Sequence, residues 1–418
     1  MSMIEEPKRI GIIGGGVSGL VCAHLLGRHY EVTLFEKEEW LGGHTHTVEV
    51  DDQQVDTGFI VFNDRTYPNF LQLLTHLGIN KRATEMSFSV SDDQANLEYN
   101  GHSLTSLFAQ RRNLFRPRFW KMIWQILRFN KLGRQLAQQG MIPTITLQQF
   151  LAEQGFDDWL ISHYLLPMGA AIWSASIDDM RQYPLPFFLR FFHHHGLLEV
   201  RNRPQWYTVL GGSHQYVQAM REAGHFKLEQ ANGVQVVRRQ QTGVEILDSM
   251  GKPWRFDEVI FACHSDQVLP LLQDSTVEEK QILSAIRYQE NDVILHTDRQ
   301  QLPRRRAAWA SWNYRMGQTP SSPVAVTYNM NILQGLLASE TYCVTLNPNQ
   351  AIKDSTIKGR YRYAHPQFDD TAEQAKAQRA QICGVNHTHY CGAYWYSGFH
   401  EDGVRSALDV CRRFGVHL

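Results

Sequence analysis

The first clear pattern of apolar and polar positions lies between residues 9 and 36. The segment reads RIGIIGGGVSGLVCAHLLGRHYEVTLFE, which is a short apolar run, a glycine-rich turn, a longer apolar segment and a second apolar run. Short apolar runs bounded by glycine are typical of buried strands, whereas the longer segment has the length of a helix. The pattern therefore predicts a strand–helix–strand unit with parallel strands.

Two long stretches with other patterns interrupt this domain. Residues 71–204 are mainly helical in pattern, whereas residues 271–384 hold the strand-like runs NDVILHTD, AAWASWNY, SPVAVTYNM and TYCVTLN. Between them, residues 233 to 272 form short β-rich runs that end in EVIFAC, which fits a return to the first sheet. We predict an α/β fold with a discontinuous first domain (1–70, 205–270 and 385–418). Two insertions, 71–204 and 271–384, would form an α+β second domain with a helical layer and a mixed or antiparallel sheet.

The glycine turn carries the spacing Gly14-x-Gly16-x-x-Gly19, and Glu36 follows the second strand. In this context the spacing is typical of a dinucleotide site, because the glycines allow a tight turn, close approach of a pyrophosphate and helix–strand contact. A carboxylate after the second strand can accept hydrogen bonds from a ribose. The alternative is a glycine turn that binds no ligand. The predicted contacts in this part of the chain are Gly14, Gly16, Val17, Ser18, Gly19, Glu36 and Lys37.

A second motif follows in KEEWLGGHTHTVEV and VDTGFIVFN. It resembles the second signature of the flavoprotein group that contains monoamine oxidases, protoporphyrinogen oxidase and phytoene desaturase. The resemblance implies a Rossmann-like FAD-binding domain with non-covalent FAD, in which a glycine pair turns the chain along the phosphates and a later segment lies beside the flavin ring. It assigns these contacts to Gly42, Gly43, His44, Thr57, Gly58, Phe59 and Ile60, and it places Val236 at the adenine side.

A narrower resemblance rests on LHTD, AWASWNY, TYNMN, TLNP and GFHEDG. These segments are similar to a bacterial group of FAD-binding, amine-oxidase-like proteins whose genes often accompany methyltransferases of the cyclopropane-fatty-acid-synthase type. The resemblance implies a lipid acyl chain as substrate and a methyltransferase as partner.

The last helix is predicted to begin in GFHEDGVRSALDV, residues 398 to 410. Its two carboxylates fit an ordinary helix cap, because acidic side chains are favoured at helix N-termini. The resembling flavoproteins instead direct this N-terminus at the cofactor, which implies that Glu401 and Asp402 bind hydroxyl or amide groups and that the amides after Gly403 meet FAD. That interpretation adds Glu401, Asp402, Gly403 and Val404 to the cofactor contacts. Phe399, Trp395 and Tyr394 are candidates for the pocket wall.

Flavin chemistry demands little of side chains, because the isoalloxazine accepts the hydride and the protein supplies orientation and a dry pocket. The sequence accordingly names no catalytic residue. Amine oxidases of the wider group often carry a lysine that holds water near flavin N5, but the matching segment YQENDVILHTD has none. The leading hypothesis is an FAD-dependent dehydrogenation of an apolar substrate, such as a phospholipid acyl chain, by hydride transfer to flavin N5. The alternatives are an amine or polyamine oxidase and a non-catalytic FAD-binding partner of a lipid methyltransferase.

Composition excludes several classes of protein. A net charge of −1 over 418 residues predicts no nucleic-acid partner for the molecule as a whole. The six cysteines contain no CxxC pair, and the N-terminus has no apolar signal segment, so we expect a cytoplasmic protein. His44 and His46 alternate along a predicted strand, but no third ligand is suggested nearby and we predict no metal.

One segment concentrates positive charge. Residues 108–134 contain eight Lys or Arg residues among Phe, Trp, Leu and Ile, and no Asp or Glu occurs from Tyr99 to Ala152. Phe119, Ile123, Ile126 and Leu127 would share one face of a helix that begins near Arg118. Such a helix fits the surface of an anionic membrane, with the protein peripheral at its inner face. The alternatives are a core helix whose arginines extend to the surface and, less favoured, a nucleic-acid patch.

Overall fold

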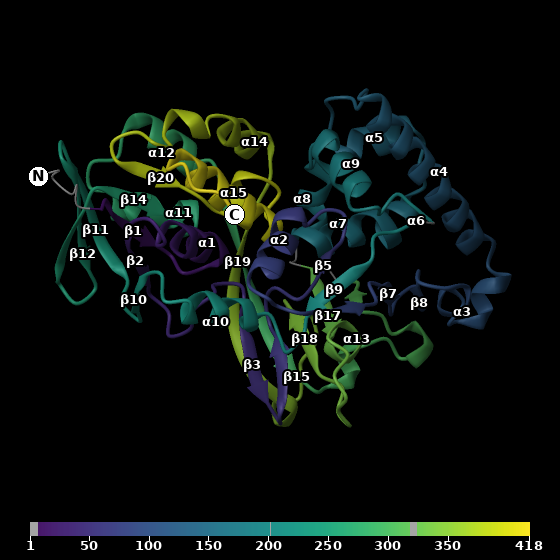
Figure 1. Ribbon diagram of the computed structural model, residues 1–418. Helices are drawn as coiled ribbons and strands as arrows, with labels where there is room; N and C mark the ends of the chain where they lie inside the picture. Colours follow the sequence, from purple (N-terminus) through teal and green to yellow (C-terminus); the bar gives the residue numbers. More distant parts are fainter. Residues whose placement is uncertain (1–6, 201, 318–323) are drawn as a thin grey trace, which may run out of the picture.

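The computed structural model describes residues 7–200, 202–317 and 324–418. The first six residues of the predicted first domain, and the start of the run SPVAVTYNM, lie outside these ranges. The described residues include a five-stranded and a seven-stranded sheet. In Figure 1 the first of these lies on the left with its helices, a helical group lies at the upper right, and the second sheet lies below that group. Two separate hydrophobic cores correspond to this division.

The first sheet is parallel and has the strand order β10-β2-β1-β14-β20. Its strands are β1 (Arg9–Ile13), β2 (Glu31–Glu36), β10 (Lys227–Gln230), β14 (Glu258–Phe261) and β20 (Thr388–Tyr390). Both faces are covered, which explains the nearly continuous apolar runs of β1 and β2. Helices α1 (Val17–Leu26) and α15 (His400–Arg413) pack on it, and segments far apart in sequence meet as predicted. The predicted α/β class is confirmed.

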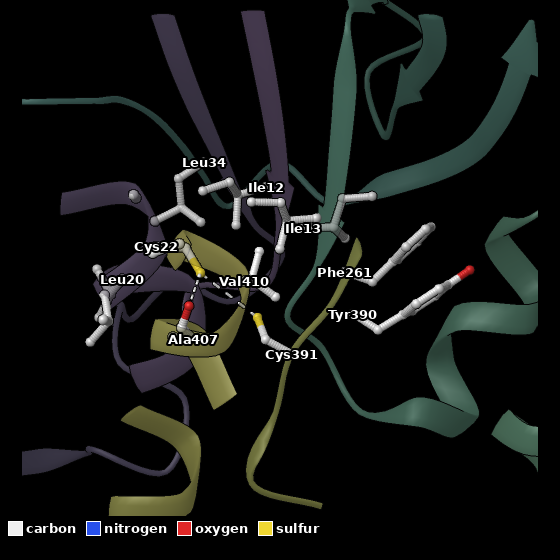
Figure 2. Close-up of a cluster of buried hydrophobic side chains, with 14 of the residues drawn as sticks. Ile12, Ile13, Leu20, Cys22, Leu34, Phe261, Tyr390, Cys391, Ala407 and Val410 are labelled. Carbon is white, nitrogen blue, oxygen red and sulfur yellow. Dashed lines mark hydrogen bonds between the residues drawn. The ribbon is translucent and has the colours of Figure 1, made fainter. Parts of the chain in front are cut away.

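Figure 2 shows how α1 and α15 are held together beneath the sheet. Ile12, Leu34 and Val410 are buried there beside the Cys22 and Cys391 thiols, whose sulfur atoms lie 4.0 Å apart. The Ser18 hydroxyl donates to the Gly403 carbonyl at 2.9 Å, and a Cβ on Gly403 would lie 2.6 Å from Val17 Cγ1. Gly403 is therefore required by the close contact between the two helices.

A second, three-stranded sheet of β11 (Val234–Gln240), β12 (Gly243–Asp248) and β13 (Pro253–Phe256) completes the first domain. The first domain also contains the helices α10 (His214–Glu222), α11 (Ser265–Leu271), α12 (Val277–Ser284) and α14 (Asp370–Ala377). Ile282 and Leu283 of α12 and Ala372 of α14 belong to the core of the first domain. The second insertion is therefore shorter at both ends than the predicted 271–384, because α12 and α14 pack with the five-stranded sheet.

The second domain is built on a mixed sheet with the order β19-β15-β18-β17-β16-β7-β8. Its pairs are antiparallel except that of β16 with β7, which joins strands from the two insertions. The strands are β7 (Phe88–Asp92), β8 (Leu97–Asn100), β15 (Tyr288–His296), β16 (Trp312–Arg315), β17 (Ala325–Asn329), β18 (Cys343–Leu346) and β19 (Ile357–Pro366).

A helical layer covers this sheet, and its longer members are α4 (Pro117–Gln139), α5 (Leu147–Glu153), α7 (Leu166–Trp173), α8 (Ile177–Gln182) and α9 (Leu185–His194). Short helices precede or join them: α3 (Leu104–Leu107), η1 (Arg111–Phe115) and α6 (Asp158–Leu160). The connections between domains are the hairpin β3 (Thr47–Val50) and β4 (Gln53–Asp56), the sheet β5 (Phe62–Asn63), β9 (Trp206–Val209) and β6 (Lys81–Thr84), and helix α2 (Pro68–His76). Strand β9 pairs with strands on either side of residue 71, so the predicted boundary near that residue crosses a continuous sheet.

Candidate functional site

A cavity of about 900 Å³ lies at the carboxyl ends of β1, β2 and β14 and extends between the two domains. This edge of a parallel sheet is where nucleotide ligands bind in open α/β folds. One end of the cavity is lined by the glycine loop and Glu36, and the other by aromatic side chains of the second domain. The cavity is thus divided into a nucleotide end and an aromatic end.

The glycine loop has two distinct kinds of glycine. A Cβ on Gly19 would lie 1.9 Å from the Gly14 carbonyl oxygen, so the turn itself excludes any side chain there. Gly16 has ordinary dihedral angles (φ −71°, ψ −179°), and a Cβ built on it meets nothing within 4 Å. The fold therefore does not require glycine at position 16, where the backbone instead borders open cavity.

The predicted acid at the end of β2 is held firmly by main-chain amides. Gly15 N donates to Glu36 Oε2 at 2.7 Å, and Glu38 N donates to Oε1 at 2.9 Å. Burial raises the pKa of Glu36, which these hydrogen bonds partly offset. The carboxylate lies beside the loop at the start of α1. Gly16 is the N-cap residue of this helix and has no side chain to accept from the first helical amides, so these amides are available to an anion.

The second motif runs along the same cavity. Gly42 N donates to the Gly15 carbonyl at 2.9 Å, which fixes the glycine pair against the first loop. Phe59 N donates to the His44 carbonyl at 2.7 Å, which brings the segment from Thr57 to Ile60 alongside. His44 Nε2 is buried without a hydrogen-bond partner among the described residues. The predicted residues that line the cavity are Gly14, Gly16, Val17, Ser18, Glu36, Lys37, Gly42, Gly43, His44, Thr57, Gly58, Phe59 and Ile60.

Val236 is a correction to the predicted site. It does not line the cavity, whereas its neighbours Gly233 and Val234 do. A bulge between Val234 and Val236 shifts the register of β11 against β12, and the strand is in contact with the cavity only at its start. Without knowledge of this bulge, the sequence could not show which residue of the β-rich segment reaches the cavity to within two positions.

The acidic pair of the last helix is also corrected. Glu401 accepts hydrogen bonds from Asn69 N at 3.1 Å and Phe70 N at 2.9 Å, so it caps α2. Asp402 accepts from Phe399 N at 2.9 Å and caps its own helix. Neither carboxylate lines the cavity, and neither do Gly403 and Val404, since α15 turns these residues toward α1 and α2. The ordinary-cap interpretation describes Asp402, and Glu401 is a cap for a second helix.

Replacement of Glu401 by Ala is expected to lower the free energy of unfolding by about 2–4 kcal/mol, because buried amides of α2 lose their acceptor. Glu401→Gln retains one acceptor oxygen and should cost about half as much. Urea unfolding of the two variants measures this difference. A Glu401→Ala protein with wild-type stability and lost cofactor would contradict the capping role.

The aromatic end combines residues of both insertions with Trp206 and Phe399, which lie outside them. Phe399 stacks on Phe191 with ring centroids 4.7 Å apart, and Trp173 lies 4.8 Å from Phe191. Other residues of this wall are Met86, Ile172, Leu197, Trp206, Trp312, Tyr328, Leu346 and Phe368. Of the three predicted wall residues, Phe399 and Tyr394 line the cavity, whereas Trp395 is buried in the first core.

Sequence patterns missed most of this wall. Besides Phe399 and Tyr394, the run PFFLRFFHHH, residues 186–195, contributes Phe191 and His195 to the cavity. The other contributors lie on separate elements and carry no local motif, so only the tertiary fold brings them together.

Burial lowers the pKa of the five histidines that line the cavity, among them His195, whose pKa falls to about 4. Burial lowers the pKa of His264, His365 and His400 to about 3 each, and it also lowers the pKa of His44. His44 and His365 stack with ring centroids 5.4 Å apart, and His365 Nδ1 lies 3.0 Å from the Ser174 hydroxyl. The pair His44-x-His46 does not act together, because His46 Nδ1 lies 2.8 Å from the Tyr363 hydroxyl instead. The described residues contain no group of three His, Cys, Asp or Glu side chains placed to hold a metal ion.

Acidification is expected to destabilise the cofactor-free protein through these histidines. Each folded-state pKa lies below the unfolded value of about 6.5, so the stabilisation is complete above that pH and is lost progressively toward pH 3. At pH 5 protonation of the unfolded chain costs about 2 kcal/mol for each of His264, His365 and His400, whose folded pKa is about 3. Between pH 7 and pH 5, urea unfolding should show that His365→Gln loses about 2 kcal/mol less free energy of unfolding than wild type does. The exposed His29→Gln variant is the control and should lose as much as wild type. Parallel curves for His365→Gln and wild type would contradict the assignment.

The fold and the cavity are those of a two-domain protein that binds a dinucleotide at the edge of a parallel sheet. A family model described as flavin containing amine oxidoreductase matches residues 17–330, and the chain belongs to this family. FAD is accordingly its cofactor, as the sequence motifs predict.

Similar structures cover nearly the whole chain. They include a putative protoporphyrinogen oxidase from Exiguobacterium sp. 255-15 (16% identity, 97% of this chain and 98% of that one, TM-score 0.68). Cyclohexylamine oxidase from Brevibacterium oxydans IH-35A has 13% identity over 98% and 100% of the two chains, with a TM-score of 0.69. A CLA-producing fatty acid isomerase from P. acnes has 14% identity over 99% and 100%, with a TM-score of 0.70. At these identities the likeness concerns the fold.

Curated relatives align only locally. Coproporphyrinogen III oxidase from Mycobacterium tuberculosis is 36% identical over 80 residues, which are 18% of this chain and 18% of that protein. The chain aligns with 13% to 18% of the length of the first curated relatives it matches.

The described residues fit FAD. The open space beside Gly16, the uncapped start of α1 and the Glu36 carboxylate form a nucleotide cradle, and the unpartnered His44 Nε2 and Tyr394 hydroxyl are buried polar atoms in or beside the cavity.

Proposed function

We propose that this protein is an FAD-dependent oxidoreductase that dehydrogenates an apolar substrate, such as the acyl chain of a phospholipid. The observation that carries the proposal is the composition of the aromatic end, where Trp173, Phe191, Trp206, Leu346 and Phe399 meet in one cavity. Such a wall favours an apolar ligand through desolvation and dispersion.

The positions of the acidic residues separate this proposal from amine oxidation. Among the described residues, the carboxylates that line the cavity are Glu36, Glu38, Asp266 and Glu290. Glu36 and Glu38 follow β2 at the nucleotide end, Asp266 begins α11 beyond β14, and Glu290 is exposed on β15. Among the described residues, the aromatic wall therefore has no buried carboxylate that could pair with the ammonium group of an amine. An aromatic cage alone could still attract a cation, which keeps amine or polyamine oxidation as the alternative to be tested.

The structural neighbours are compatible with either substrate class. The similar structures include two enzymes named for amines, putrescine oxidase and cyclohexylamine oxidase, and one named for a fatty acid. The charge of the cavity wall is therefore the stronger argument for an apolar substrate.

The parts played by the chain follow from the cavity. The amides at the start of α1 would bind the pyrophosphate of FAD, and Glu36 would accept hydrogen bonds from its ribose. When bound, FAD supplies the hydride acceptor at flavin N5. Phe399, Phe191 and Trp173 would orient the substrate and exclude water. The neutral ring of His365 can donate or accept one hydrogen bond without introducing charge.

Mass spectrometry of molecules released from the natively purified protein tests this proposal. We expect intact, non-covalent FAD together with a phospholipid or fatty acid. Release of FAD with a polyamine or another amine, and with no lipid, would support the alternative and overturn the apolar substrate.

A further inference from the structure

Helix α4 has two apolar stripes. Phe119, Met122, Phe129 and Gly133 are buried against the second domain. On the outer side Trp120 is 48% exposed, Trp124 61% and Leu127 49%. The sequence pattern placed Phe119 and Leu127 on one face, but the helix buries the first and exposes the second. Helix α4 is therefore a core helix on its inner side, and it also carries an apolar stripe on its outer side.

The outer stripe continues into the turns before the helix. Phe115 is 86% exposed, Leu104 77% and Leu114 44%. We call these residues, together with the outer stripe of α4, the basic aromatic face. Its apolar members are Leu104, Leu114, Phe115, Trp120, Trp124 and Leu127, and its basic members are Arg111, Arg118 and Lys131. Single exposed apolar residues are normal on a protein surface, but six of them on neighbouring elements mark an interaction site.

The charge of this face is positive and little compensated. Of its flanking residues, Lys121 pairs with Asp157 at 2.5 Å and Arg134 with Glu199 at 3.6 Å. Within residues 7–200, 202–317 and 324–418, Arg111 and Lys131 make no ion pair. The chain supplies no Asp or Glu from residue 99 to residue 152, although the whole protein is nearly neutral. Positive charge is thus concentrated in this one segment of the chain.

We propose that the basic aromatic face docks on an anionic lipid bilayer. Trp and Phe are favoured at the headgroup level of a membrane, and each neighbouring Lys or Arg adds attraction to anionic lipids. None of the helices described here is long and apolar enough to cross a bilayer, so the contact is at the surface. An ordinary protein partner would not require uncompensated positive charge beside tryptophans, whereas an anionic bilayer attracts both.

The position of α4 connects this face to the cavity. On its inner side, a Cβ at Gly133 would lie 3.2 Å from Leu189 of α9. Helix α9 also supplies Phe191 to the cavity wall, and His195 follows at its end. Helix α9 therefore contacts both α4 and the aromatic end of the cavity. The docking proposal does not depend on the substrate, because it rests on the surface alone.

Sedimentation with vesicles of phosphatidylglycerol and phosphatidylcholine tests the proposal, using the FAD-loaded protein. We expect wild type to bind these vesicles, to bind pure phosphatidylcholine at least about tenfold more weakly, and to dissociate in high salt. The double variants Phe115→Ser/Trp124→Ser and Arg111→Glu/Lys131→Glu should each lose about tenfold or more in vesicle affinity. Arg116, Lys121 and Arg128 are poorer choices, since each is hydrogen-bonded within the protein.

Matched controls lie on other elements. Met250→Ser removes a side chain that is 74% exposed in the β12–β13 turn, and Arg221→Glu/Arg255→Glu changes charge equally on α10 and β13. Both should bind vesicles as wild type does, with unchanged flavin absorbance in every variant. Brominated phosphatidylglycerol is also expected to quench the tryptophan fluorescence of the wild-type protein. This second measurement needs no variant.

Three results would overturn the proposal: equal binding to neutral and anionic vesicles, loss of binding in the control variants equal to that in the test variants, or retention of single-stranded RNA with no vesicle binding.

Discussion

Gly16→Ala is expected to weaken FAD binding by about 100-fold, equivalent to about 3 kcal/mol, without loss of the fold. The dihedral angles of Gly16 suit any residue, and an added Cβ meets no protein atom within 4 Å. A methyl group at this position would instead occupy the space into which the pyrophosphate of a dinucleotide must approach the backbone. Fluorescence titration of the cofactor-free protein with FAD measures the loss.

Two other glycines supply the controls. Gly101→Ala also has open space around the added Cβ, but it lies in a turn outside the cavity, so FAD affinity and stability should both be retained. Gly19→Ala should lower the stability of the cofactor-free protein itself, because the Cβ would overlap the Gly14 carbonyl. Wild-type FAD affinity in Gly16→Ala would mean that the cofactor does not approach this loop.

Phe399→Ala is expected to slow anaerobic reduction of the flavin by the apolar substrate about 30- to 100-fold, a loss of about 2–3 kcal/mol. The ring stacks on Phe191 and forms part of the cavity wall, so its removal leaves the substrate poorly oriented and admits water. Stopped-flow measurement of flavin bleaching gives the rate, and the unchanged oxidised spectrum shows that FAD remains bound.

The conservative variant Phe399→Leu, which keeps an apolar side chain, should stay within about fivefold of wild type. Phe399→Glu should abolish reaction with the apolar substrate, because it buries a carboxylate in the wall. If Phe399→Glu and wild type reduced at the same rate, Phe399 would not contact the substrate.

The first domain was predictable because its signals are local. The strand–turn–helix–strand unit and the second glycine motif each lie within a few dozen residues, and their residues line one cavity. Four of the seven strands in the second sheet, β15 to β18, were predicted from their runs, whereas β7, β8 and β19 were not. The parallel pairing of β16 with β7 joins residues more than 200 positions apart and has no local signature.

The failures have physical causes. Glu401 was assigned to the cofactor because a carboxylate at a helix start carries the same sequence pattern whether it caps its own helix, another helix or a ligand. Its true partners, Asn69 and Phe70, belong to an element more than 300 residues away. Val236 was assigned to the cavity because the bulge in β11 has no signal in the sequence. Helix α4 has apolar residues on both its buried and its exposed side, and periodicity alone cannot tell which of them are buried.

The association with a methyltransferase stays a prediction from the narrower resemblance. Co-purification from the native host, followed by identification of the bound protein, is the corresponding measurement.

Anaerobic titration of the purified yellow protein tests the central claim most directly. With a phospholipid extract, the visible absorbance of the bound flavin is expected to bleach and to recover when an electron acceptor is added. A panel of monoamines and polyamines at the same concentration should leave the spectrum unchanged. Bleaching by amines and not by lipids would contradict the apolar substrate, and failure to bleach with either panel would contradict the proposed oxidoreductase activity.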